Sequence, residues 1–89
     1  MKMTQDNFYK EIVRLLHRLA DDKNPDQMAY SVYLYMREHP ENVKMDKAWG
    51  DMMKNMKILL SKHLGWKMSD IHRFFMKLRN LTQYMKKSS

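Results

Sequence analysis

Four stretches of the chain carry apolar residues at the three- and four-residue spacing that places them on one side of an α-helix. The first covers about residues 5–20, and Thr4 is its expected N-cap because the hydroxyl can accept from an early backbone N–H. The second covers about residues 25–38, where Pro25 suits a first helical turn. Asn24 stands between them, and a residue before proline avoids the α region, so the chain breaks there.

The third stretch covers about residues 43–64 and contains Gly50, which either bends the helix or divides it, at a cost of about 1 kcal/mol relative to alanine. Gly65 is the expected C-cap, since glycine adopts the left-handed conformation readily. The fourth stretch begins at Ser69 or Asp70, with Ser69 as the expected N-cap, and ends near residue 85.

The apolar stripes of these four helices are expected to face a common core. They comprise Phe8, Ile12, Leu15 and Leu19; Met28, Ala29, Val32, Tyr35 and Met36; Met45, Trp49, Met52, Met56 and Leu59; and Ile71, Phe74, Phe75, Leu78 and Leu81. No strand-like alternation and no internal repeat is present. The sequence therefore predicts an all-α fold: a compact bundle of four to five short helices in residues 1–85, with a frayed basic tail at 86–89.

Charge divides the chain into two unequal halves. Residues 1–42 carry six basic and seven acidic groups, whereas residues 43–89 carry eleven basic and three acidic groups. The whole chain has a formal net charge of +7. Basic surface concentrated in one half attracts polyanions or acidic protein surfaces, so the second half is where we expect a partner to bind.

Composition argues against several other classes of function. The chain has no cysteine, which excludes disulfides and thiolate chemistry, and its two glycines form no phosphate-binding loop. The histidines, at positions 17, 39, 63 and 72, lack the helical pairing of a zinc site, and no serine has the surroundings of a nucleophile. We therefore expect no enzyme, cofactor or metal. No apolar run is long enough for a signal peptide or a membrane span, which predicts a cytoplasmic protein with no membrane partner.

One segment of the basic half has a recognisable pattern. Residues 58–78 read ILLSKHLGWKMSDIHRFFMKL, with small, apolar or glycine residues at the positions where two helices would cross and turn. These positions are Ser61, Leu64, Gly65, Trp66, Ile71 and Phe74. The segment resembles the generic helix-turn-helix DNA-binding motif, and no specific family is indicated.

The resemblance implies that the helix after the turn enters the DNA major groove with its N-terminal residues foremost. The nucleic-acid-binding residues would then be Lys67, Ser69, His72, Arg73, Lys77 and Arg79. Arg73 would reach a guanine edge, and Lys67, Lys77 and Arg79 would contact phosphates. This hypothesis describes a small, non-enzymatic DNA-binding protein that acts as a transcriptional or phage-type regulator. A homodimer held by the apolar second helix would read two half-sites.

The alternative hypothesis is a protein-interaction module, an inhibitor or adaptor that docks a basic, Met- and aromatic-rich face on an acidic surface of a larger protein. Flexible methionine side chains line adaptable binding surfaces. Candidate interface residues are Tyr30, Tyr33, Met53 and Met76. The two tyrosines lie one turn apart, and an edge-of-core position is the favoured interpretation for them. RNA is a lesser option, because the aromatic residues needed for base stacking look buried.

Overall fold

A computed structural model of the chain describes residues 4–19, 24–43 and 47–87, without the side chains of Ala48 and of residues 84–87. Its elements are α1 (Gln5–Leu19), α2 (Pro25–Glu38), a 3-10 turn η2 (Pro40–Asn42), α3 (Lys47–Ile58), a π-helical turn η3 (Leu59–His63) and α4 (Met68–Lys87). No strand occurs in these ranges. The expected all-α bundle of short helices is confirmed.

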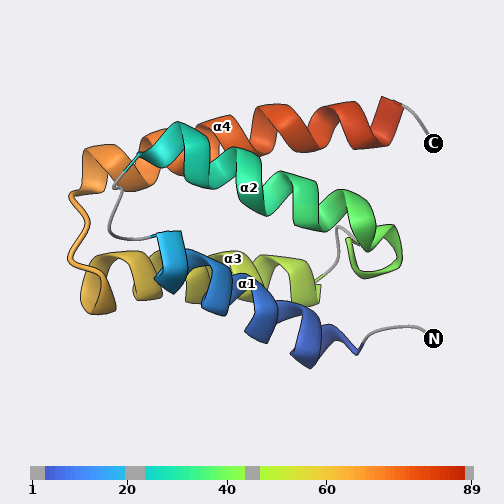
Figure 1. Cartoon of the computed structure of the whole chain (residues 1–89), viewed down its shortest axis with the longest axis horizontal. Helices are drawn as coiled ribbons and strands as arrows, with labels where there is room; N and C mark the ends of the chain where they lie inside the picture. The colour runs from blue at the N-terminus through green and yellow to red at the C-terminus, as the bar shows by residue number, and fades with distance from the viewer. Residues whose placement is uncertain (1–3, 20–23, 44–46, 88–89) are drawn as a thin grey trace.

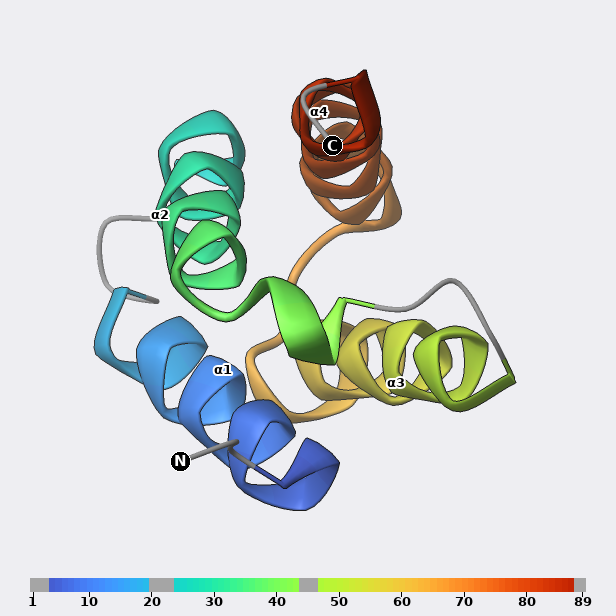
Figure 2. The same ribbon diagram turned by 90° about the vertical axis from the view of Figure 1, so that its right-hand side faces the viewer.

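The four α-helices lie at four corners when the bundle is seen end-on (Figure 2). In the side view, α2 and α4 form the upper layer, while α1 and α3 form the lower layer (Figure 1). The helix α2 packs chiefly on α4 and also on α1. The main partner of α4 is therefore α2, and few contacts join α3 to α4 among the described residues.

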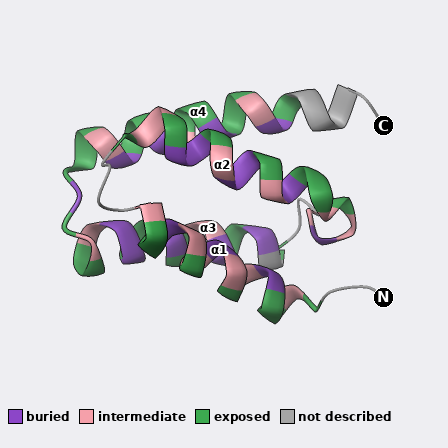
Figure 3. Ribbon diagram, viewed as in Figure 1, coloured by how far each residue is buried: buried purple, intermediate pink, exposed green. Residues whose placement is uncertain are grey.

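The core is built from the inward stripes of the helices (Figure 3). Its largest fully buried side chains are Phe8, Ile12, Leu16, Met28, Val32, Met36, Met56, Leu60, Ile71 and Phe74. Most members of the expected stripes are buried or half-buried. Leu16, one position from the expected stripe, is fully buried, whereas Leu15 and Leu19 are half-buried. Met45 lies outside the described residues.

The first two helices begin where the sequence predicts. The Thr4 hydroxyl accepts a hydrogen bond of 3.2 Å from the Asn7 backbone N–H. At the start of α2, the Asn24 side-chain oxygen accepts from the Gln27 N–H at 3.2 Å, with Pro25 in the first turn. The helix α1 is described as far as Leu19, and Ala20 lies outside the described residues.

The third helical stretch begins later than expected and ends in a widened turn. Val43 is not helical, residues 44–46 are not described, and α3 continues through Gly50 without a break. Its continuation η3 is a π-helical turn, closed by a hydrogen bond of 3.0 Å from the Leu64 N–H to the Leu59 carbonyl. Gly65 follows with a φ of 65°, in the left-handed region that the sequence predicts for it.

We expect Gly65→Ala to lower the free energy of unfolding by about 1–2 kcal/mol, because an L-residue adopts the left-handed conformation at that cost. An added Cβ would meet no atom within 4 Å, so steric overlap contributes nothing. Gly50→Ala is the control: it is helical, equally uncrowded, and expected to stabilise by about 0.5–1 kcal/mol. Urea denaturation followed by circular dichroism measures both. Equal effects of the two substitutions would contradict this account of Gly65.

The start of α4 differs from the expectation. The helix begins at Met68, so Ser69 lies inside the first turn and the prediction that it is the N-cap is wrong. The backbone carbonyl of Lys67 accepts from the Ile71 N–H at 3.0 Å, which makes Lys67 the residue from which the helix starts. At the other end α4 extends to Lys87, and Ser88 and Ser89 of the expected tail lie outside the described residues.

Candidate nucleic-acid interface

The side of α4 that faces solvent is cationic. The exposed residues between positions 67 and 83 are Lys67, Met68, Ser69, His72, Arg73, Met76, Lys77, Arg79, Asn80 and Gln83. The acid within this range, Asp70, is half-buried. All six residues implied by the helix-turn-helix resemblance are therefore exposed on α4 or on the linker before it. We call Lys67, Arg73, Lys77 and Arg79 the cationic face of α4.

The cations of α4 lie along both flanks of its exposed side. The helical repeat places Lys77 about 40° from Arg73 and Arg79 about 160° from Lys77. Arg73 contacts α2, whereas Arg79 borders α3, so the two flanks are defined by contacts as well as by spacing. Between the flanks lie the uncharged side chains of Ser69, Met76 and Asn80.

Arg73 forms an ion pair across the α2–α4 contact. Its Nη2 donates to Oδ2 of Asp26 at 3.3 Å, and the two side chains are 67% and 46% exposed. Pairs this exposed contribute about 0–1 kcal/mol to stability. Arg73 can therefore leave Asp26 for a more strongly charged anion at small cost. No signal in the sequence points to Asp26, because the partners are 47 positions apart.

The proposed protein-interface residues lie on three helices. On α2, Tyr33 is buried at the core edge with the Arg37 guanidinium 5.9 Å above its ring, whereas Tyr30 is 48% exposed. Met76 on α4 is also exposed, and Met53 on α3 is half-buried.

Met53 belongs to a groove between α3 and α4. These two helices lie one above the other on the same side of the end-on view (Figure 2). The groove has a volume of about 400 Å³. Its lining residues are Trp49, Met53, Phe75, Leu78, Arg79, Thr82 and Gln83. Sequence reasoning assigned Trp49, Phe75 and Leu78 to the core and did not predict a groove beside them.

Two tyrosines that pack against the core, Tyr9 on α1 and Tyr35 on α2, have raised pKa values. Burial raises the pKa of Tyr35, and the negative charges of Glu11 and Glu38 raise it further. Burial also raises the pKa of Tyr9. Both phenols therefore stay protonated at neutral pH and add no negative charge to the surface.

Other kinds of site find no support in the part of the chain that the structure describes. These residues contain no group of three or more His, Asp or Glu side chains placed to hold a metal ion. None of their helices combines the length and the apolar character needed to cross a membrane. The chain matches no known family model, no curated protein and no solved structure.

Proposed function

We propose that this protein is a small, non-enzymatic DNA-binding regulator of helix-turn-helix type that docks the cationic face of α4 on duplex DNA. The observation that carries the proposal is the exposed surface of positions 67–83, which holds four cations and no exposed carboxylate. Neutralisation of phosphates by such cations releases counterions and supplies affinity for any duplex.

The arrangement of side chains on α4 suits a helix lying in the major groove, which is about 12 Å wide and accepts one α-helix. Arg73 and Lys77 on one flank would meet one phosphate strand, and Arg79 on the other flank would meet the second. The residues between them would then face base edges. Asn80 has the amide that pairs with adenine, and Arg73 has the reach to contact either a phosphate or a guanine.

The connection before α4 supports the helix-turn-helix type. Residues 64–67 link η3 to α4, which agrees with the three- to four-residue turn of the motif. Gly65 provides the left-handed residue in that turn. Because α4 packs mainly on α2, the proposal depends on the exposed face of α4 more than on the contact between the two motif helices.

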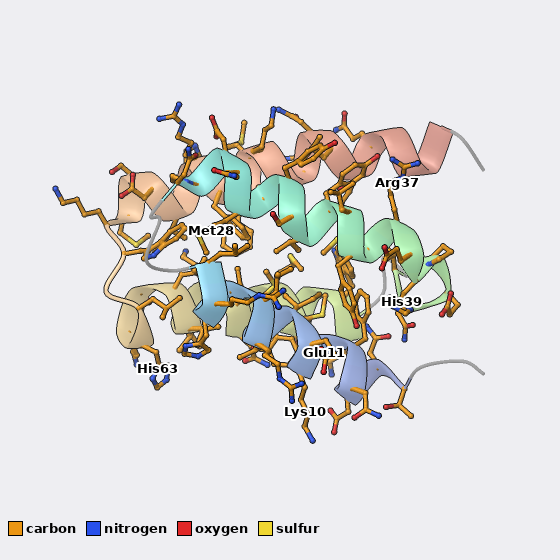
Figure 4. All side chains as sticks on the ribbon, viewed as in Figure 1. Lys10, Glu11, Met28, Arg37, His39 and His63 are labelled. Atoms are coloured by element: carbon orange, nitrogen blue, oxygen red, sulfur yellow. The ribbon has the colours of Figure 1, made fainter. Side chains whose placement is uncertain are left out.

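A mobility-shift titration against random-sequence duplex at low salt tests the proposal. The wild-type protein should retard the duplex, and Lys77→Glu should weaken binding by about tenfold or more. Lys10→Glu makes the same charge change at an exposed position of α1, on the side away from α4 (Figure 4), and should keep wild-type affinity within about twofold. No retardation by the wild type, or equal losses in both variants, would overturn it.

Alanine substitutions separate the two roles within the face. Arg73→Ala should relax sequence preference, whereas Lys77→Ala should weaken binding to all sequences alike. Binding-site selection from a random duplex pool, followed by titration of selected and scrambled duplexes, measures the difference. If Arg73→Ala kept the preference of the wild type, Arg73 would have no part in base recognition.

Neutralising the partner of Arg73 should strengthen DNA binding. Asp26→Asn removes a carboxylate beside the cationic face and frees the Arg73 guanidinium, so we expect duplex affinity to rise by about two- to fivefold at low salt. The free energy of unfolding should change by less than about 1 kcal/mol. Both quantities come from titration and urea denaturation of the same preparation.

Glu11→Gln is the matched control for this prediction. Glu11 pairs with Arg14 at 3.1 Å on α1, so the substitution also breaks an exposed ion pair and removes one negative charge. It lies on the side of the bundle away from α4 (Figure 4), and duplex affinity should stay unchanged. An equal rise in both variants would indicate a response to net charge alone and would contradict a specific role for Arg73.

A further inference from the structure

We propose that the groove between α3 and α4 binds an acidic amphipathic helix of a partner protein, which inserts large apolar side chains between the two helices. This site is separate from the proposed DNA contact, because the groove lies on the flank of α4 and not on its outer side. Arg79 is the residue common to both sites.

The walls of the groove are apolar, with Trp49 and Leu78 buried at its base and Met53 and Phe75 half-buried. Trp49 and Met53, one turn apart on α3, form one wall, and Phe75 and Leu78 on α4 form the other. Met53 and Phe75 are half-buried although both pack against the core. A volume of about 400 Å³ is within the range of small binding sites.

The methionine makes the groove adaptable. Met53 has an unbranched, polarizable side chain that can adjust to the shape of an inserted group. Arg79 and Gln83 are exposed and line the groove, so the apolar walls have a polar border. Apolar surface with a polar rim is typical of a protein-interaction site, and an amphipathic helix fills such grooves with side chains spaced three and four residues apart.

The charges around the groove select an acidic partner. Arg79 lines it, and Lys57 is exposed one turn beyond Met53 on the same side of α3. The acids of these helices point elsewhere: Asp51 lies about 160° around α3 from Met53, and Asp70 about 180° around α4 from Arg79. No described residue of the lining is a carboxylate.

The positive charge around the groove also argues against a second copy of this chain as the partner that fills it. The chain carries a net charge of +7, so a self-contact through this groove would bring cationic borders together. A helix with Glu or Asp on its exposed side would instead place its carboxylates beside Arg79 and Lys57. The charge of the groove therefore favours a different, acidic protein.

The test uses a fluorescein-labelled 16-residue synthetic helix with Leu and Phe on one side and Glu on the other. Fluorescence anisotropy should report saturable binding to the full chain, and a peptide with Lys in place of Glu should bind at least about tenfold more weakly. In two-dimensional NMR spectra, the Glu peptide should shift the Trp49 indole signal. Failure to bind at about 1 mM protein, or equal binding of both peptides, would overturn the proposal.

Two matched pairs of variants locate the site. Arg79→Glu should weaken peptide binding at least about tenfold, while Lys77→Glu, about 160° away on the same helix, should change it less than about twofold. Met53→Glu should also abolish binding, and Ile58→Glu, which alters an exposed residue of the same helix, should not. Equal losses within either pair would mean non-specific attraction to a basic protein and would refute the groove.

The same variants distinguish this inference from the proposed function. Lys77→Glu is expected to weaken duplex binding and to spare peptide binding, whereas Met53→Glu is expected to do the reverse. Peptide binding without duplex retardation would reject the DNA proposal alone. Duplex retardation without peptide binding would reject the groove alone.

Discussion

Replacing Phe74 with alanine should lower the free energy of unfolding by about 3–5 kcal/mol, the cost of removing a large buried aromatic side chain. Phe74 is fully buried on the inner side of α4. Its ring lies edge-on to Trp66, with centroids 6.1 Å apart, and edge-on to Phe75 at 5.2 Å. The side chain therefore holds both α4 and the linker against the core, and its loss leaves a cavity between them.

The effect should be measured by urea denaturation, with circular dichroism and tryptophan fluorescence as probes. Small domains have total stabilities of about 5–15 kcal/mol, so Phe74→Ala is expected to be partly unfolded at 37 °C. Phe74→Leu removes less volume and should lower the free energy of unfolding by about 1–2 kcal/mol. This variant can still be measured if the alanine variant does not fold.

Met76→Ala is the control, because Met76 is 45% exposed two positions further along the same helix. Its expected effect lies within about 0.5 kcal/mol. A similar cost for Met76→Ala and Phe74→Ala would contradict the orientation of α4. If Phe74→Ala lowered the free energy of unfolding by less than about 1 kcal/mol, Phe74 would not be a core residue.

The helices could be predicted because their signals are local. The spacing of apolar residues fixes which side of each helix is buried, and Thr4 and Pro25 mark helix starts through contacts within one turn. The all-α fold, the start of α1 and both boundaries of α2 follow from such signals. Ser69 shows the limit of this reasoning, since this good capping residue lies two positions after Lys67, the residue from which the helix starts.

Contacts between distant residues could not be predicted in this way. The apolar stripe of α4 fits a neighbour on either side, and nothing in its spacing says that α2 is the main partner. The same is true of Gln5 and Asn42, whose side-chain amides are joined by a hydrogen bond of 3.1 Å across 37 positions. Such pairs depend on the tertiary arrangement, which a single sequence leaves open.

The same distinction between local spacing and contacts of distant residues applies to the candidate sites. Exposure of the cationic face follows from helical spacing, because Arg73 and Lys77 lie about 100° around the helix from Phe74 and Leu78, which belong to the buried stripe. The groove does not follow from it, since Phe75 belongs to the apolar stripe and is left half-buried by the separation of α3 from α4. The ion pair between Asp26 and Arg73 likewise could not be predicted from the sequence.

The affinity for duplex DNA should fall by about 150-fold when monovalent salt is raised from 50 to 200 mM. This figure is what about four phosphate contacts predict, since each contributes about 0.9 to the slope of log affinity against log salt. Four is the number of cations in the face formed by Lys67, Arg73, Lys77 and Arg79, where Arg73 is counted because it lies beside Lys77 on the flank that would meet one phosphate strand. The measurement is a series of anisotropy titrations of a labelled duplex at increasing salt.

Neutral substitutions then assign the slope to residues. Lys77→Gln should reduce the slope by about 0.9, so that the same salt step costs about 40-fold, whereas Lys10→Gln on α1 should leave the slope unchanged. Both substitutions remove one positive charge from the chain. A difference between their salt slopes therefore shows which surface contacts the DNA, because the net charge of the two variants is the same. A slope near zero would show that phosphate neutralisation does not hold the complex together. An equal decrease in both variants would show that the DNA does not select α4, and either result would reject this face as the DNA-binding site.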